Sequence, residues 1–302
     1  QIVIYYWMEF FGTTETATRM LSILYTSGAS LFAYLTILKI YGRRSALFIA
    51  MSMNISYLMM YYSLETRSYT QTLFISTAST YFLLCYFSEG FNTIKQHKWL
   101  VAIIISNVGL ILTHYYNIIF IMAQGIFFFW YFCHKTNYKH LSRHLIRTAV
   151  VYFIPVISLL VLWYPGIESA FNREQSQFPE GKEVTHPLVV LIMLFHQNID
   201  NSRLLFSIIP IILGLITFFN RKSKKRRQMS IKSYGYLYFT WLTISLPFLS
   251  MLMTAIGRFS ERYMIYYIPV MMAFVVLNIE YGIVALDRLT NRYFRFTRHY
   301  LK

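Results

Sequence analysis

A carboxylate and a guanidinium lie two residues apart in the segment Glu65-Thr66-Arg67-Ser68-Tyr69, which separates two long apolar stretches. Ionisable side chains at the edge of such stretches are costly, and they usually have a partner or a ligand. One interpretation is that Glu65 and Arg67 form an ion pair that only fixes a turn. The other is that the pair binds a charged ligand. The sequence leaves both open.

A second polar and aromatic segment, Thr113-His114-Tyr115-Tyr116-Asn117, has a histidine near its centre. The imidazole of His114 can act as a general acid or base, or it can donate a hydrogen bond to a sugar or phosphate. The alternative is a histidine that sits at a membrane interface beside a belt of tyrosines.

The third segment is Arg258-Phe259-Ser260-Glu261-Arg262-Tyr263. Arg258 and Arg262 are four residues apart and share one face if the segment is helical. Two guanidinium groups directed at one point make a phosphate clamp. The alternative is an ion pair of Glu261 with either arginine.

The elements that must position these residues are transmembrane helices. The chain is 56% hydrophobic and 13% charged, and its mean hydropathy is +0.45, values that indicate an integral membrane protein. A bilayer core requires roughly 20 apolar residues per helix. This length predicts an all-α, polytopic protein with about nine spans, at residues 20–41, 45–62, 69–88, 99–113, 117–133, 148–164, 203–220, 233–257 and 263–285.

The charges of the connecting segments predict the orientation. Segments after the first, third, fifth and seventh spans are strongly basic, as is the tail 286–302, whereas the others carry both signs in similar amounts. By the positive-inside rule, the basic set and the C-terminus are cytoplasmic. This topology accounts for the net charge of +16, so we exclude nucleic acid as a partner.

The opposite, extracytoplasmic side carries all three motifs. We expect residues 1–19 to form an aromatic juxtamembrane segment in which Thr13 or Thr14 caps the following helix. The segment 165–202 is predicted to be an outer loop with an amphipathic helix that covers a cavity as a lid. The whole chain, 1–302, is interpreted as a single domain.

The order and placement of these motifs resemble membrane glycosyltransferases of the GT-C fold. The resemblance is to the branch with protein O-mannosyltransferases, aminoarabinose transferases and lipopolysaccharide sugar transferases. Members show Phe-Gly-x-x-Glu with a nearby Arg, a Glu-x-Arg-x-Tyr turn, a Thr-His-Tyr-Tyr-like turn and a late Arg-Tyr. Matching segments here are Phe11 to Glu15 with Arg19, Glu65 to Tyr69, Thr113 to Tyr116, and Arg262-Tyr263.

The resemblance implies transfer of a sugar from a polyprenyl or dolichyl phosphate to a glycan, lipid or protein acceptor on the extracytoplasmic face. It implies catalytic roles for Glu65 and Arg67, with a divalent metal ion at Glu65 as an option. It also implies that the donor phosphate or its sugar is bound by Arg67, Tyr69, His114, Tyr115, Arg258 and Arg262. A bacterial plasma membrane is the favoured location, with the endoplasmic reticulum as the eukaryotic counterpart.

In that family the principal catalytic carboxylate precedes the aromatic segment, which predicts an N-terminally incomplete sequence with its catalytic base upstream of Gln1. Two rival functions are a lipid or small-solute transporter or flippase, and a catalytically inactive membrane subunit. Transporters more often carry charges at mid-membrane and internal repeats. The expected spans carry few charges at depth, and Glu280 is expected to snorkel to the cytoplasmic end or to pair with Arg288.

Overall fold

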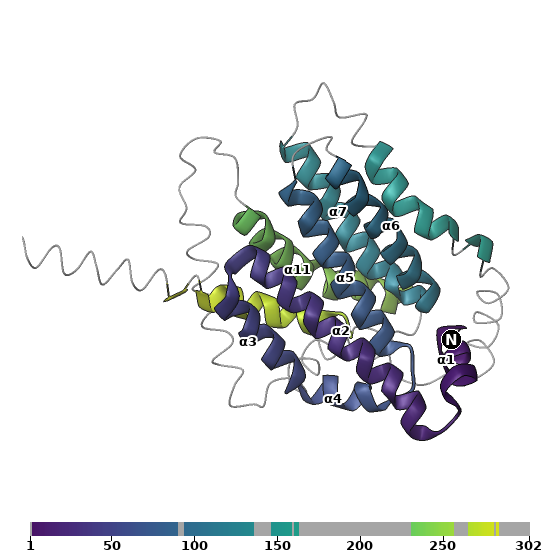
Figure 1. Ribbon diagram of the computed structural model, residues 1–302. Coiled ribbons are helices and arrows are strands. Elements are labelled where there is room, and N and C mark those ends of the chain that lie inside the picture. The colour runs from purple at the N-terminus through teal and green to yellow at the C-terminus, as the bar shows by residue number, and fades with distance from the viewer. Residues whose placement is uncertain are drawn as a thin grey trace, which may run out of the picture.

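The computed structural model describes residues 2–89, 94–135, 146–158, 160–162, 231–256, 265–280 and 282–283. Within these ranges every regular element is a helix (Figure 1). The labelled elements are α1 (Ile2–Phe11), α2 (Glu15–Tyr41), α3 (Arg43–Asn54), α4 (Tyr57–Leu64), α5 (Tyr69–Ser88), α6 (Ile94–Thr113), η1 (Tyr115–Asn117), α7 (Ile118–Lys135) and α11 (Ile231–Ile256). Two further helices are Ile146–Leu162 and Tyr267–Glu280. The predicted all-helical class is confirmed for the described part.

Three described helices are long and apolar enough to cross a membrane: Glu15–Tyr41, Gln96–Thr113 and Tyr115–Cys133. α3 and α4 meet the same criteria only as a pair, and they are bent by 55° where they meet. The span expected at 45–62 is therefore broken. α5 has the bounds expected for the span 69–88, but its many Ser and Thr side chains make it less apolar. Nine spans remain a prediction.

The N-terminal helix α1 is fastened to the first turn of α2. Thr14 caps α2 by accepting a hydrogen bond from the backbone N–H of Ala17, as the sequence predicts for Thr13 or Thr14. The indole N–H of Trp7 donates to the carbonyl oxygen of Ala17 at 2.7 Å. The chain reverses between the helices at Gly12, whose φ of 85° favours glycine. α1 consequently lies beside the beginning of α2 (Figure 1).

The bundle is held together by close helix contacts around aromatic side chains. A Cβ atom at Gly235 of α11 would lie 2.7 Å from Ile40 of α2, so the missing side chain lets these helices approach. Gly28 of α2 makes the same kind of approach to Phe74 of α5. Small residues have this role in membrane helices because backbones can pack closely there.

A polar cluster at the centre of the bundle was not expected from the sequence. Its hub is Gln124 of α7, which is fully buried. Gln124 exchanges hydrogen bonds with Ser79 of α5, donates to Tyr238 of α11, and accepts from Asn107 of α6 and from Tyr152. We call these five residues the Gln124 cluster. Each lies on a different helix, so the cluster joins five helices by hydrogen bonds within the apolar interior.

α2 and α3 approach the helix Tyr267–Glu280 at the end of the bundle opposite α1. The hydroxyl of Ser45 at the start of α3 donates to the carboxylate of Glu280. The sequence suggested snorkelling or pairing with Arg288 for Glu280; the structure gives it Ser45 as a partner, and Arg288 lies outside the described residues. In the same region the hydroxyl of Tyr41 donates to the carbonyl of Lys232.

Several predictions fall on segments that the structure does not describe. They are the lid at 165–202, the span 203–220, the tail 286–302, and Arg258 and Arg262.

Candidate functional site

A cavity of about 330 Å³ lies at the end of the bundle where α2 begins. Its walls come from α1, from the N-terminal half of α2, from the first turn of α5, and from the two turns that carry Arg67 and His114. The lining residues are Ile4, Leu21, Ser22, Tyr25, Thr66, Arg67, Ser68, Tyr69, Gln71 and His114. The volume reaches the lower limit of the range typical of small-molecule pockets.

The turn between α4 and α5 places Arg67 in the cavity wall. The hydroxyl of Ser22, on α2, donates to the carbonyl oxygen of Glu65 at 2.8 Å and fixes the start of this turn. Nε of Arg67 lies 3.8 Å from Oε2 of Glu65, which is an ion pair but too long for a hydrogen bond. Glu65 does not belong to the cavity lining. Its carboxylate therefore faces Arg67 rather than the cavity.

The Arg67 side chain is 55% exposed. Because the guanidinium is largely solvated and lies 3.8 Å from the carboxylate, its pair with Glu65, whose side chain is 25% exposed, contributes only modestly to stability. The guanidinium also lines the cavity, where it can bind an anion through two parallel hydrogen bonds.

The turn after α6 brings His114 to the same cavity. Nδ1 of His114 accepts a hydrogen bond from the backbone N–H of Tyr116 at 3.3 Å. The imidazole is stacked on the rings of Tyr115 and Tyr116, with centroids 5.0 Å and 5.5 Å away. Burial lowers the pKa of His114 to about 4. The ring is thus neutral at pH 7, with its proton on Nε2, so it can donate a hydrogen bond but carries no positive charge.

The structure therefore brings together three residues that the sequence singled out, Arg67, Tyr69 and His114, although they come from two separate turns. Tyr115 stacks behind His114 and is not part of the lining. Of the described lining residues only Arg67 carries a charge at neutral pH; the others are apolar, hydroxyl, amide or imidazole groups. This arrangement suits a ligand that combines one anionic group with hydroxyl groups.

A divalent metal ion at Glu65 has no support from the described part of the site. Among the described residues, no three His, Cys, Asp or Glu side chains come close enough together to hold a metal ion. Magnesium, calcium and zinc sites draw on several such ligands. We derive no chemical step through a metal.

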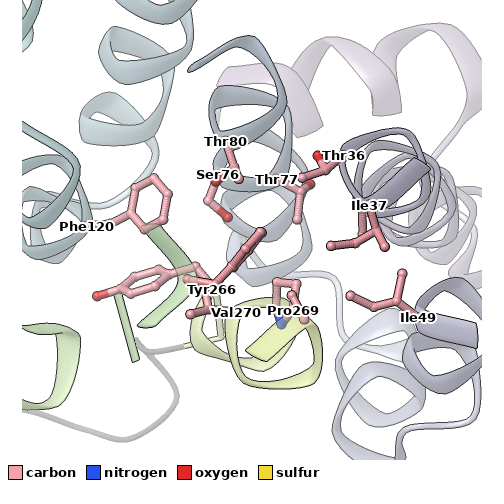
Figure 2. Close-up of a pocket in the computed structure, with 13 residues that line it drawn as sticks. Thr36, Ile37, Ile49, Ser76, Thr77, Thr80, Phe120, Tyr266, Pro269 and Val270 are labelled. Atoms are coloured by element: carbon pink, nitrogen blue, oxygen red, sulfur yellow. The ribbon is translucent and has the colours of Figure 1, made fainter. Parts of the chain in front are cut away.

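A second, much smaller cavity lies deeper, between α2, α3, α5 and the helix Tyr267–Glu280. Figure 2 shows Ile37 and Ile49 on one side, Phe120 on the other, and Ser76, Thr77 and Thr80 of α5 along the top. Its volume is about 20 Å³, the space of one water molecule. It is too small for a substrate, and it contains none of the residues that the sequence singled out.

The comparison with family models decides the classification. The model described as dolichyl-phosphate-mannose-protein mannosyltransferase matches residues 2–163, which is more than half of the chain. The chain belongs to this family. No curated protein and no solved structure matches it.

As a member of the dolichyl-phosphate-mannose-protein mannosyltransferase family, the protein is an integral, multi-pass membrane protein of a glycosyltransferase family whose members use lipid-phosphate sugars. The matched region contains both turns that face the cavity. The family resemblance inferred from the motifs is confirmed.

Sequence reasoning missed five polar members of the cavity wall: Ser22, Tyr25, Thr66, Ser68 and Gln71. The sequence signal for Ser22, Tyr25 and Gln71 was weak, because each lies inside a predicted helix. Their places in the cavity wall depend on how α2 and α5 pack together. Thr66 and Ser68 lie within the Glu65 to Tyr69 motif, so they could have been named from their neighbours.

Proposed function

We propose that this protein transfers a sugar from a polyprenyl or dolichyl phosphate to an acceptor at the extracytoplasmic face of its membrane. The observation that carries the proposal is the juxtaposition of Arg67, Tyr69 and His114 around one cavity in a chain of this family. A bacterial plasma membrane remains the favoured location. The sugar and the acceptor are left open.

Arg67 has the central role in the proposed reaction. When the bond between the sugar and the phosphate breaks, negative charge grows on the phosphate oxygens. A guanidinium that is already in place stabilises that charge more in the transition state than in the ground state, and this lowers the barrier. Glu65 then serves to orient Arg67, through the ion pair at 3.8 Å.

Neutral groups complete the proposed donor site. His114 donates from Nε2 to a phosphate or sugar oxygen, and Tyr69 offers a hydroxyl from the first turn of α5. Tyr115 supports the imidazole by stacking on it. Arg258 and Arg262, outside the described residues, are proposed as a second set of phosphate ligands, and the segment 165–202 as the lid.

The extracytoplasmic orientation is supported by the distribution of charge along α2. The cavity lies at its beginning, whereas Lys39, Arg43 and Arg44 lie at its far end. Under the positive-inside rule the far end is cytoplasmic, so the cavity opens on the other side.

The experiment compares the thermal stability of the purified protein with and without a polyprenyl phosphate, for wild type and Arg67→Ala. A ligand at 100 times its dissociation constant stabilises the folded state by about 2.7 kcal/mol. We expect this stabilisation in the wild type and its loss in Arg67→Ala. Because Arg67 is exposed, its removal should cost less than about 1 kcal/mol in the absence of ligand.

The matched control is Arg19→Ala. Arg19 is also an exposed arginine that pairs with a glutamate, Glu15, at the same end of α2, and it does not line the cavity. This variant should retain the stabilisation. Equal loss of the stabilisation in both variants would mean that the lipid binds through general surface charge. An unchanged stabilisation in Arg67→Ala would refute the proposed role of Arg67.

The family membership favours transfer over transport. The interior also favours it, since no charged side chain is fully buried among the residues that the structure describes. Thermal stability does not separate a transferase from a catalytically inactive subunit that binds the lipid phosphate; an assay of sugar transfer does.

A further inference from the structure

Asn117 closes the turn that carries His114. Its side chain is 1% exposed. Nδ2 donates to the carbonyl oxygen of Leu110 at 2.7 Å and to Oγ1 of Thr72 at 3.2 Å, so both amide hydrogens are used. The backbone N–H of Asn117 donates to the carbonyl oxygen of His114 at 3.0 Å.

These bonds join the end of α6 to the beginning of α5. The carbonyl of Leu110 lies in the last turn of α6 and also accepts from the backbone N–H of His114. Thr72 follows Gln71 on α5, and Gln71 lines the cavity. One amide group thus fixes the distance between the His114 turn and the helix that begins with Tyr69.

An asparagine is the side chain that suits this position. Aspartate has the same shape but offers no hydrogen, so one of its oxygens would face the Leu110 carbonyl and repel it. Leucine also has a similar size, but it leaves the Leu110 carbonyl without the side-chain donor and Thr72 without its partner. Either change frees the turn without removing any group from the cavity, because Asn117 does not line it.

We propose that Asn117 is a positioning residue, which holds the imidazole of His114 at the cavity through its bonds to Leu110 and Thr72. This inference rests on the proposed function for its effect on donor binding. The position of His114 itself can be tested without that function.

The first test is a double-mutant cycle on the affinity for a polyprenyl phosphate, using wild type, Asn117→Leu, His114→Gln and the double variant. We expect Asn117→Leu to weaken binding roughly 3- to 10-fold, the range of one lost hydrogen bond. In the His114→Gln background the same change should have little further effect, because it acts through His114. Equal losses in both backgrounds would overturn the proposal.

The second test measures the pKa of His114 by NMR of histidine-labelled protein in micelles, with the signal assigned by its absence in His114→Gln. In the wild type, burial keeps this pKa well below its ordinary value of 6.5. In Asn117→Leu the freed imidazole should meet water, and its pKa should rise toward 6.5. An unchanged pKa would overturn the proposal even if donor binding were affected.

Two further variants separate a specific effect on His114 from a general loss of folding. Thr72→Val preserves the shape of the threonine and removes only one of the two bonds, so it should shift the His114 pKa in the same direction by less. Asn278→Leu is the matched control: Asn278 is equally buried and donates to the carbonyl of Phe274 in its own helix. It should lower stability and leave the His114 pKa unchanged. A shift of that pKa in Asn278→Leu would show that any buried amide has this effect.

The two hypotheses fail separately. If the wild type binds no polyprenyl phosphate, the proposed function is wrong, and the NMR titration alone decides the role of Asn117.

Discussion

Replacement of Gln124 by leucine should destabilise the helix bundle measurably. Leucine has a similar volume, so the packing is preserved while the hub of the Gln124 cluster is removed. Tyr152 loses the acceptor that its hydroxyl has at 3.3 Å, and Tyr238 loses the donor at 3.2 Å. Asn107 loses its bond of 3.4 Å to Gln124, and Ser79 loses its bond of 3.2 Å to Gln124. Ser79 keeps its bond to Asn107 at 3.0 Å.

The magnitude follows from the lost interhelical bonds of Gln124 to these four partners. Hydrogen bonds between membrane helices contribute about 0.6 kcal/mol on average and up to roughly 1.7 kcal/mol. Four of them amount to about 2.4 kcal/mol, with roughly 7 kcal/mol as an upper limit. The loss of stability should exceed the lower of these two figures, because the hydroxyl of Tyr152 loses its hydrogen-bond acceptor in an apolar interior.

The assay is reversible unfolding in mixed micelles, followed by tryptophan fluorescence. Trp241 is a suitable reporter because its indole N–H donates to the carbonyl of Ala123, next to Gln124. The control pair is Ser79→Ala and Ser106→Ala: Ser79 bonds across helices, whereas Ser106 bonds to Ala102 in its own helix. A loss below about 0.5 kcal/mol in Gln124→Leu, or equal losses in the two serine variants, would refute the reasoning.

Three further predictions follow. Gly235→Ala forces a Cβ to 2.7 Å from the fully buried Ile40, whereas the Cβ of Gly109→Ala makes an ordinary contact at 3.5 Å. Thermal unfolding should therefore show Gly235→Ala to be less stable than Gly109→Ala by about 1–3 kcal/mol, the cost of overpacking. Equal stabilities of the two variants would contradict the close approach at Gly235. Thr14→Ala removes the cap of α2 and should cost about 1 kcal/mol in the same assay; an unchanged stability would show the cap to be dispensable. The pKa of His114 is lowered to about 4 in the folded protein, from 6.5. Its contribution to stability is therefore complete above pH 6.5 and is lost as the pH falls toward 4. The stability difference between wild type and His114→Gln, measured across this range, should shrink on acidification, and a constant difference would contradict the burial of the imidazole.

The parts of the fold that depend on local chemistry could be predicted from the sequence. Thr14 precedes an apolar helical stretch and has a side chain that suits a cap, so the start of α2 was foreseeable. The bounds of α5 followed from the length of its apolar segment. The break between α3 and α4 was not foreseeable in this way, because no proline or glycine marks it; Asn54 and Ser56 around it are its only local signal.

The parts that depend on tertiary packing could not be predicted. Asn107 and Gln124 each stand alone in an apolar helix, and nothing in the sequence places them next to each other. In the candidate site, the sequence singled out Arg67 and His114 as separate candidates. Their meeting around one cavity follows from the packing of α5 against α2 and α6. The sequence left open whether Glu65 pairs with Arg67 or binds a ligand with it, and the structure shows the ion pair.

The most direct test of the central claim is cross-linking with a polyprenyl phosphate that carries a photoreactive group next to the phosphate, followed by mass spectrometry of the labelled peptides. We expect labelling at residues 66–71 and at His114. Excess unlabelled polyprenyl phosphate should suppress this labelling, whereas the uncharged polyprenol should not. Labelling that is absent from these residues, or that polyprenol abolishes equally well, would contradict a phosphate site at this cavity.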